Sequence, residues 1–257
     1  MSRTEWIYGL HAVRAILMRN PDRVRAIRAA ARRDDARLRE IEQLAVDHQL
    51  PIQRVDADAL KRQFGEAAHQ GVAAEVTPAQ MWNEDDLLVA LQANPAPLLL
   101  VLDGVQDPHN LGACLRTADA CGALAVVVPR DRAAQLNSTV RKVAAGAAET
   151  TPVASVVNLA RTLKLLKEGG LWIVGADGDA PMPAARADLS GPVALVLGAE
   201  GAGLRRLTRE TCDLLVQLPR LGAVESLNVS VAAGMLLYEA VRQRTPLAHA
   251  KQGARQG

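Results

Sequence analysis

The sequence contains five consecutive apolar residues at Leu98-Leu99-Leu100-Val101-Leu102. An apolar run of this length without alternation is typical of a strand that is buried on both faces in a parallel sheet. Four further segments of the same kind lie at residues 123–128, 171–174, 193–197 and 213–218, and helical patterns lie between most of these segments. The sequence therefore predicts an α/β fold with a mainly parallel sheet, helices on both faces and a ligand site at the carboxyl ends of the strands.

The sequence ahead of residue 98 predicts a smaller α/β unit. Helical spacing of apolar residues at 10–17 and 38–45 alternates with strand-like segments at 24–30, 51–55 and 71–76. We expect Val24, Ala26 and Arg28 to share one face of their strand. Prolines and an acidic cluster then indicate a connector with a short helix inside. The predicted organisation is an N-terminal domain over residues 1–77, a linker over 78–97, a main domain over 98–245 and a basic, disordered tail over 246–257.

The composition excludes several classes of protein. The 257 residues are 49% hydrophobic and 23% charged, as in ordinary globular proteins. The sequence shows neither a run of eighteen apolar residues nor an apolar segment behind a basic start, so we expect no membrane span and no signal peptide. Cys114, Cys121 and Cys212 cannot all pair within one chain and lack the spacing of a metal site. They indicate a reducing, cytoplasmic location, packing roles and no metal.

Positive charge is concentrated in one stretch and in the tail. Seven arginines lie between Arg23 and Arg39. A solvated helix face with Asp34, Asp35 and Glu40 as partners is favoured over a phosphate-contacting patch. Aromatic residues make up only 2% of the chain, which favours packing over base stacking for the three tryptophans, Trp6, Trp82 and Trp172.

Polar and small residues follow three of the predicted strands. After Leu102, the pair Asp107-Pro108 marks a turn, and Asn110 is expected to cap the helix that carries Arg116. After Leu218, a helix is expected to begin near Ser226 or Asn228 and to extend to Arg242. Taken alone, each of these segments is explained by capping.

The third segment is a glycine-rich turn after Leu197. Gly198, Gly201 and Gly203 surround the carboxylate of Glu200. Their spacing is not that of the dinucleotide fingerprint, and no Lys-Ser or Lys-Thr pair follows. A nicotinamide dehydrogenase and a phosphate-loop enzyme are therefore disfavoured.

Together and in this order, the three segments resemble the three motifs of the SpoU-type RNA ribose 2′-O-methyltransferases, which form the TrmH family of the SPOUT superfamily. The matching stretches are residues 107–116, 197–203 and 226–232. Residues 8–13 and 69–74 resemble the small, ribosomal-protein-like RNA-binding domain of one branch of that family. This branch includes an enzyme that methylates a guanosine of 23S ribosomal RNA. The resemblance covers almost the whole chain except the tail.

The resemblance implies an enzyme with S-adenosylmethionine as its cofactor and a SPOUT catalytic domain over residues 98–245 that contains a C-terminal trefoil knot. It implies that main chain around Gly198, Leu218 and Leu227 lines the cofactor pocket, with Gly175 and Ala176 adjoining. The implied partners are 23S rRNA or a large-subunit precursor during ribosome biogenesis, and a second copy of the chain bound through the last helix.

For catalysis, the resemblance assigns the central role to Arg116, either as a base assisted by a substrate phosphate or as a stabiliser of the developing alkoxide. Asn110, Glu200, Ser226 and Asn228 would orient Arg116, the ribose and the cofactor. Glu225 stands where the family usually has a small polar residue, and we expect its side chain to point to solvent.

Two alternatives remain open at this point: a transfer-RNA ribose methyltransferase, and a catalytically silent RNA-binding assembly protein. The N-terminal domain argues against the first alternative. The joint presence of the five site residues argues against the second.

Overall fold

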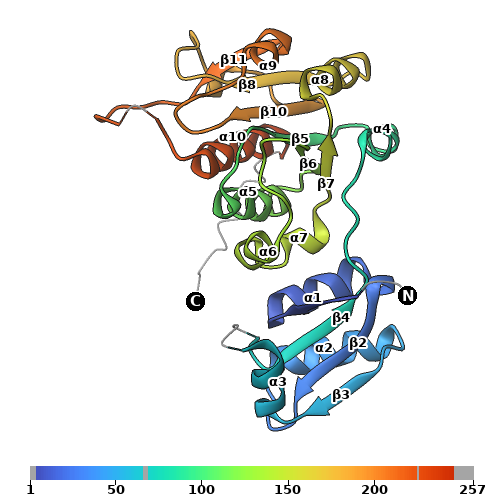
Figure 1. Ribbon diagram of the computed structural model, residues 1–257. Coiled ribbons are helices and arrows are strands. Elements are labelled where there is room, and N and C mark those ends of the chain that lie inside the picture. Colours follow the sequence, from blue (N-terminus) through green and yellow to red (C-terminus); the bar gives the residue numbers. More distant parts are fainter. Residues whose placement is uncertain (1–3, 66–68, 225, 246–257) are drawn as a thin grey trace, which may run out of the picture.

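The computed structural model describes residues 4–65, 69–224 and 226–245, and it contains two sheets (Figure 1). A four-stranded sheet has the order β1-β4-β2-β3, and a seven-stranded sheet has the order β7-β6-β5-β10-β8-β11-β9. We call the parts built on them the N-terminal unit and the main unit. Glu225, with its side chain expected to point to solvent, and the tail at 246–257, expected to be disordered, lie outside the described residues.

The N-terminal unit packs two helices against one face of its sheet. Buried side chains of α1 and α2, such as Val13 and Ile41, meet Ile7 and Ile27 of the sheet in one core. Helix α3 lies on the other face, where it contacts β2. The elements are β1 (Glu5–Tyr8), α1 (Leu10–Arg19), β2 (Val24–Ala30), α2 (Ala36–Asp47), β3 (Ile52–Val55), α3 (Ala57–Phe64) and β4 (Val72–Val76).

The strand β2 corrects one predicted pattern. Val24, Ile27 and Ala29 are buried, whereas Arg28 is only partly covered. The register with β4 shifts between Val24 and Ala26, which marks an irregularity of the β-bulge type. Such a shift changes the alternation of faces along a strand, so the prediction that Val24, Ala26 and Arg28 share one face was wrong.

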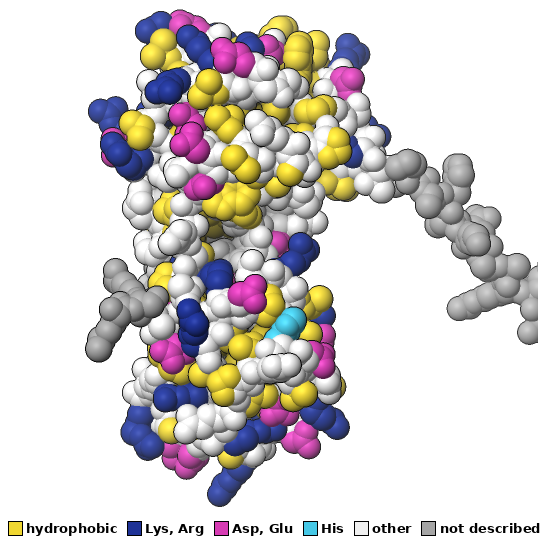
Figure 2. Space-filling model, turned by 90° about the vertical axis from the view of Figure 1, so that its right-hand side faces the viewer, with side chains coloured by type: hydrophobic (Ala, Val, Ile, Leu, Met, Phe, Trp, Pro, Cys, Tyr) yellow, Lys and Arg dark blue, Asp and Glu magenta, His cyan; other side chains and the backbone are white. Residues whose placement is uncertain are grey.

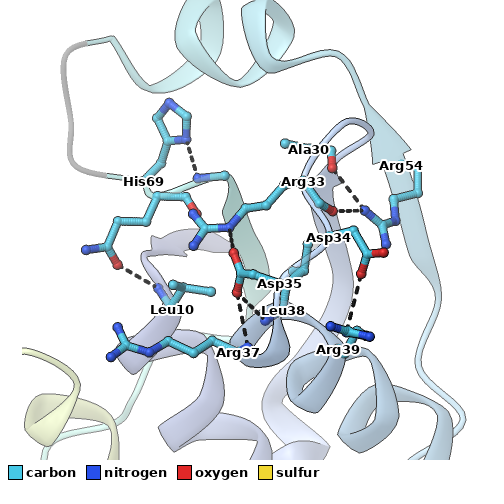
Figure 3. Close-up of polar contacts among 12 residues, drawn as sticks. Leu10, Ala30, Arg33, Asp34, Asp35, Arg37, Leu38, Arg39, Arg54 and His69 are labelled. Carbon is cyan, nitrogen blue, oxygen red and sulfur yellow. Dashed lines mark hydrogen bonds and ion pairs between the residues drawn. The ribbon is translucent and has the colours of Figure 1, made fainter.

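The arginine-rich stretch is a strand, a turn and a helix start rather than one helix face. Figure 3 shows the turn, where Arg33 binds Asp35 at 2.5 Å and Arg39 binds Asp34 at 3.4 Å. Glu40 instead binds Arg14, which precedes the stretch. The predicted pairing with Asp34 and Asp35 is thus confirmed, but the single helix face was wrong.

The main unit is an all-parallel sheet covered on both faces, as predicted. Helices α5, α6, α7 and α10 bury one face, and α4 and α8 bury the other (Figure 1). Among the described residues, no helix has the length and apolar content needed to cross a membrane. The elements are α4 (Glu84–Gln92), β5 (Leu98–Asp103), α5 (Pro108–Ala120), β6 (Ala125–Pro129), α6 (Ser138–Ala144), α7 (Ala147–Thr150), β7 (Val153–Val156), α8 (Leu159–Glu168), β8 (Trp172–Ala176), β9 (Met182–Pro183), β10 (Val193–Gly198), α9 (Arg206–Thr211), β11 (Leu214–Gln217) and α10 (Val229–Arg244).

A buried carboxylate joins the two units. The side chain of Glu149 on α7 is 2% exposed and accepts hydrogen bonds from Arg23, at 2.9 Å, and from Arg141. Arg141 also lies 3.1 Å from Glu5 on β1. Gly146 lets α1 approach α7 closely, because a Cβ at this position would lie 3.2 Å from Ala12 Cα. Figure 2 shows the waist between the units, with basic and acidic side chains on both sides of it.

Replacing Glu149 by glutamine is expected to destabilise the protein. The change leaves Arg23 and Arg141 without their shared counter-charge in a buried setting, which costs roughly 3 kcal/mol. Urea unfolding followed by circular dichroism measures the loss. The control is Glu210→Gln, which removes an exposed pair with Arg206 and is expected to change stability by less than about 1 kcal/mol. Equal stability of the two variants would contradict the structural role of Glu149.

The three cysteines are expected to react slowly with iodoacetamide at pH 8 in the folded protein. Burial raises the pKa of the Cys114 thiol to about 12 and, together with the nearby Asp213, that of Cys212 to about 11. Burial also raises the pKa of Cys121. Because only the thiolate reacts, labelling should become fast only in denaturant. Mass spectrometry of labelled peptides checks this, and rapid native labelling of Cys114 would contradict it.

Candidate active site

The three motif segments meet at one edge of the main sheet. Strands β5 and β10 are parallel neighbours, and their carboxyl ends pair at Asp103 and Gly198. The helix α5 starts just beyond the first of these ends, and α10 packs against both α5 and β10. Segments separated by about a hundred residues in the sequence are therefore brought to one place.

Asn110, Glu200 and Asn228 form a hydrogen-bonded cluster. The side-chain amide of Asn228 donates to Glu200 Oε1 at 2.5 Å and to Asn110 Oδ1 at 2.9 Å. Asn110 Nδ2 also lies 3.3 Å from the same carboxylate oxygen. The main-chain N–H of Val229 donates to it at 3.2 Å. One residue from each motif thus takes part, and the carboxylate is held at the N-terminus of α10, where the helix dipole favours a negative charge.

The cap of α5 differs from the prediction. Asp107, not Asn110, is the N-cap, because its carboxylate accepts a hydrogen bond from His109 N–H at 2.9 Å and Pro108 occupies the first helical position. Asn110 lies in the first turn, so its amide is free to reach Glu200. At α10 the predicted cap is confirmed, because Asn228 Oδ1 accepts from Ser230 N–H at 2.9 Å.

An ion pair that the sequence did not indicate supports the glycine-rich turn. Asp103 is 1% exposed and accepts hydrogen bonds from both the main-chain N–H and the guanidinium of Arg205, at 3.0 and 2.5 Å. The contact ties the end of β5 to the residue that follows the turn. A carboxylate directly after five apolar residues was the available signal.

The turn itself requires glycine for two reasons. Gly201 and Gly203 have φ values of 76° and 63°, a region that glycine adopts without strain. At Gly198 the reason is space, since a Cβ would lie 2.0 Å from Gly203 C and 2.1 Å from its carbonyl oxygen. The turn packs tightly against the end of β10. This conformation places the Glu200 carboxylate within hydrogen-bond distance of the two asparagines.

Arg116 and Ser226 do not join the hydrogen-bonded cluster. Both are exposed, and neither side chain makes a hydrogen bond or ion pair with a residue that the structure describes. Arg116 lies on α5 six residues after Asn110, on a different side of the helix. Its guanidinium is thus available to a ligand, and its catalytic role stays a prediction.

The residues expected to hold the cofactor fall into two groups. Leu218 and Leu227 are half-buried, and their main-chain N–H and C=O groups make no hydrogen bonds within the described ranges. Such free main-chain groups between apolar side chains suit the edge of an adenine ring. Gly175, in contrast, is enclosed, because a Cβ there would lie 2.7 Å from Cys212 Sγ and 2.8 Å from Leu204. Its packing explains the glycine, and a direct contact of Gly175 or Ala176 with the cofactor stays a prediction.

No group of three or more His, Cys, Asp or Glu side chains among residues 4–65, 69–224 and 226–245 could hold a metal ion. The polar side chains of the cluster are two amides and one carboxylate, which can orient a hydroxyl group. The Arg116 guanidinium lies outside the cluster, and a guanidinium can bind a phosphate and stabilise an oxyanion.

Comparison with known families identifies the class of protein to which this site belongs. Residues 97–238 match the SpoU rRNA methylase family, and residues 6–82 match the family described as RNA 2′-O ribose methyltransferase substrate binding. The chain belongs to the SpoU rRNA methylase family, as its motifs predicted.

Two relatives and two solved structures make the comparison more specific. The 23S rRNA (guanosine-2′-O-)-methyltransferase RlmB of Pseudomonas aeruginosa is 54% identical, over 96% of this chain and 100% of the relative. The RlmB of Vibrio vulnificus is 52% identical, over 93% of this chain and 97% of the relative. The SpoU methyltransferase AviRb from Streptomyces viridochromogenes, solved with AdoMet, is 25% identical with a TM-score of 0.74, over 94% of this chain and 90% of that one. An RNA 2′-O ribose methyltransferase structure is 28% identical with a TM-score of 0.71, over 95% and 90%.

Proposed function

We propose that the protein transfers a methyl group from S-adenosylmethionine to the ribose 2′-oxygen of a guanosine in 23S ribosomal RNA. The observation that carries this proposal is the cluster of Asn110, Glu200 and Asn228, which joins all three motifs of the family at one edge of the sheet. The relatives that share more than half of their residues with this chain are named for this reaction.

The main chain around Leu218, Leu227 and Gly198 would hold the cofactor. The N–H and C=O groups of Leu218 and Leu227, which have no hydrogen-bond partner among the described residues, would be available to an adenine edge, and the tight turn after Gly198 would line the rest of the pocket. When bound, S-adenosylmethionine supplies a methyl group on a positively charged sulfur, which is a strong electrophile. A trefoil knot that shapes this pocket, and cofactor contacts at Gly175 and Ala176, are part of the proposal.

The protein's own residues then act on the ribose. A 2′-hydroxyl is a weak nucleophile until its proton leaves. The Arg116 guanidinium binds the adjacent phosphate and stabilises the negative charge that develops on the 2′-oxygen. A guanidinium stays protonated in ordinary settings, so the proton leaves by way of the phosphate or water. Glu200 holds the amides of Asn110 and Asn228 in place, and Ser226 adds a hydroxyl at the approach to α10.

A methylation assay with two RNA classes tests the proposal. The protein is incubated with S-adenosylmethionine labelled on its methyl group and with unmodified 23S rRNA, a large-subunit precursor or transfer RNA. The expected result is one labelled ribose at a guanosine of the 23S sequence. Labelling of transfer RNA alone would establish the second candidate. Absence of label from every RNA despite cofactor binding would indicate an RNA-binding assembly protein.

The assembly expected for this enzyme is a homodimer formed through α10. Val231, Met235 and Tyr238 are 51%, 38% and 65% exposed and recur at helical spacing on one side of this helix. We expect light scattering to give twice the 27.4 kDa chain mass. Tyr238→Glu should give the mass of one chain, because the charge would be buried in the interface. Full activity of a wild-type protein that is monomeric at the assay concentration would contradict the dimer.

The domain organisation and location complete the proposal. The N-terminal domain over residues 1–77 binds the RNA, and the linker over 78–97 joins it to the catalytic domain over 98–245. The protein acts in the cytoplasm, where large-subunit precursors are assembled and where free thiols stay reduced.

A further inference from the structure

A cavity of about 240 Å³ lies between the N-terminal unit and α6. The edge strand β1 forms one wall with Trp6 and Tyr8, and α6 forms the facing wall with Ser138 and Lys142. None of these residues belongs to the three motifs of the methylation site. The cavity therefore lies at the contact between the two units and is formed by residues outside the three motifs.

The wall on β1 is unusually aromatic for this protein. The chain has six aromatic residues, and three of them gather here. The ring centroid of Phe64 lies 5.5 Å from that of Trp6 and 5.9 Å from that of Tyr8, and the Arg28 guanidinium lies 4.9 Å from the Trp6 ring. Phe64 supports the other two rings from outside the cavity, whereas Trp6 and Tyr8 line it. Partly exposed aromatic rings on a sheet are what unpaired nucleobases stack on in RNA-binding proteins.

Of the two described cationic residues that line the cavity, Arg141 is paired with carboxylates and Lys142 is not. Glu149 is engaged by Arg23 and Arg141, and Glu5 also lies beside Arg141. Lys142 is exposed, and its ammonium group has no hydrogen-bond or ion-pair partner among the described residues. It can neutralise a phosphate at the mouth of the cavity.

Helix α6, which forms one wall of the cavity, packs tightly on α5, the helix that carries Asn110. A Cβ at Gly112 would lie 2.7 Å from Val143 Cβ and 2.9 Å from the Val140 carbonyl oxygen. Gly112 comes two residues after Asn110 on α5. Helix α6 thus links the cavity to α5 through direct packing.

We propose that this cavity accepts an unpaired nucleobase of the RNA substrate, next to the methylated nucleotide, with the base stacked on Trp6 and Tyr8 and its phosphate bound by Lys142. The inference rests on the proposed function, because it takes RNA as the substrate. It assigns substrate recognition to residues that the motifs do not include, and it gives the contact between the two units a role in binding.

Steady-state methylation kinetics on the full-length protein test the proposal. Tyr8→Ala and Lys142→Ala are each expected to raise the KM for RNA about tenfold, with kcat and the cofactor dissociation constant unchanged, since the contacts are made away from the reacting atoms. Tyr8→Phe is expected to restore the wild-type KM, because it keeps the stacking ring. Lys164→Ala is the matched control, since Lys164 is an exposed lysine on α8, across the sheet from α6, and should leave KM unchanged.

Two further measurements separate binding from packing. Phe64→Ala loosens the aromatic cluster without removing a wall of the cavity, so its KM should rise less than that of Tyr8→Ala. Ultraviolet cross-linking of the wild-type complex, mapped by mass spectrometry, should place RNA on the peptide that contains residues 5–8. Wild-type KM in both Tyr8→Ala and Lys142→Ala, or equal effects of Phe64→Ala and Tyr8→Ala, would overturn the inference. An inactive wild-type protein would instead contradict the proposed function.

Discussion

Replacing Arg116 by alanine is expected to lower kcat for ribose methylation by about 100- to 1000-fold and to leave cofactor binding unchanged. The guanidinium is exposed on α5 and makes no hydrogen bond or ion pair with a side chain in the described part of the chain. Its removal therefore breaks no polar contact among these residues, and the expected loss is that of its interaction with the substrate. Single-turnover methylation measures the first effect, and calorimetric titration with S-adenosylmethionine measures the second.

Two other substitutions sharpen this test. Arg116→Lys keeps a positive charge but loses the planar fork that binds a phosphate through two hydrogen bonds, so it should remain well below wild-type activity. Arg206→Ala removes an exposed arginine of α9 that pairs with Glu210, and it should retain full activity. Full turnover by Arg116→Ala would remove Arg116 from the mechanism.

Replacing Gly198 by alanine is expected to abolish measurable cofactor binding. The added methyl group would overlap the main chain of Gly203 and Leu204, with contacts of 2.0 to 2.4 Å. Main-chain atoms cannot rotate away as a side chain can, so the turn that carries Glu200 must shift as a whole. Such overpacking costs about 1–3 kcal/mol or more, and here the strain falls on the turn that closes the site.

The matched control is Gly191→Ala. Gly191 precedes β10, at the opposite end of the strand from Gly198, and a Cβ there meets nothing within 4 Å. Titration calorimetry should detect no heat with S-adenosylmethionine for Gly198→Ala and a wild-type profile for Gly191→Ala. Wild-type affinity of Gly198→Ala would show that the turn does not form part of the cofactor pocket.

The sequence predicts the buried strands well and the short elements poorly. Runs such as Leu98–Leu102 are strands because both of their faces are covered, and continuous apolar character reports this directly. The strand β9 has only two residues, and β1 contains four residues of mixed polarity, so neither has enough length to show a period. The faces of β2 were predicted wrongly from simple alternation of side chains, because the strand contains a bulge. The bulge is a shift in register against β4, and this pairing is not visible in the local sequence.

In the site, too, some features could be predicted from the sequence, whereas contacts between residues far apart in the sequence could not. The motif residues Asn110, Glu200 and Asn228 were predicted to act together, and their side chains are hydrogen-bonded. The cap of α5 was assigned to the wrong residue because both Asp107 and Asn110 have the chemistry of a cap. The ion pair of Asp103 with Arg205 spans about a hundred residues of sequence, and only the parallel pairing of β5 with β10 brings its partners together.

The carboxylate of Glu149 has a consequence for engineering this enzyme. Its two arginine partners come from different units, Arg23 from the N-terminal unit and Arg141 from the main unit. A chimera that joins this N-terminal unit to the catalytic domain of another enzyme would bring Arg23 to a surface that lacks its acceptor. We therefore expect an exchange of N-terminal units to preserve stability only when the acceptor for Arg23 is transferred as well.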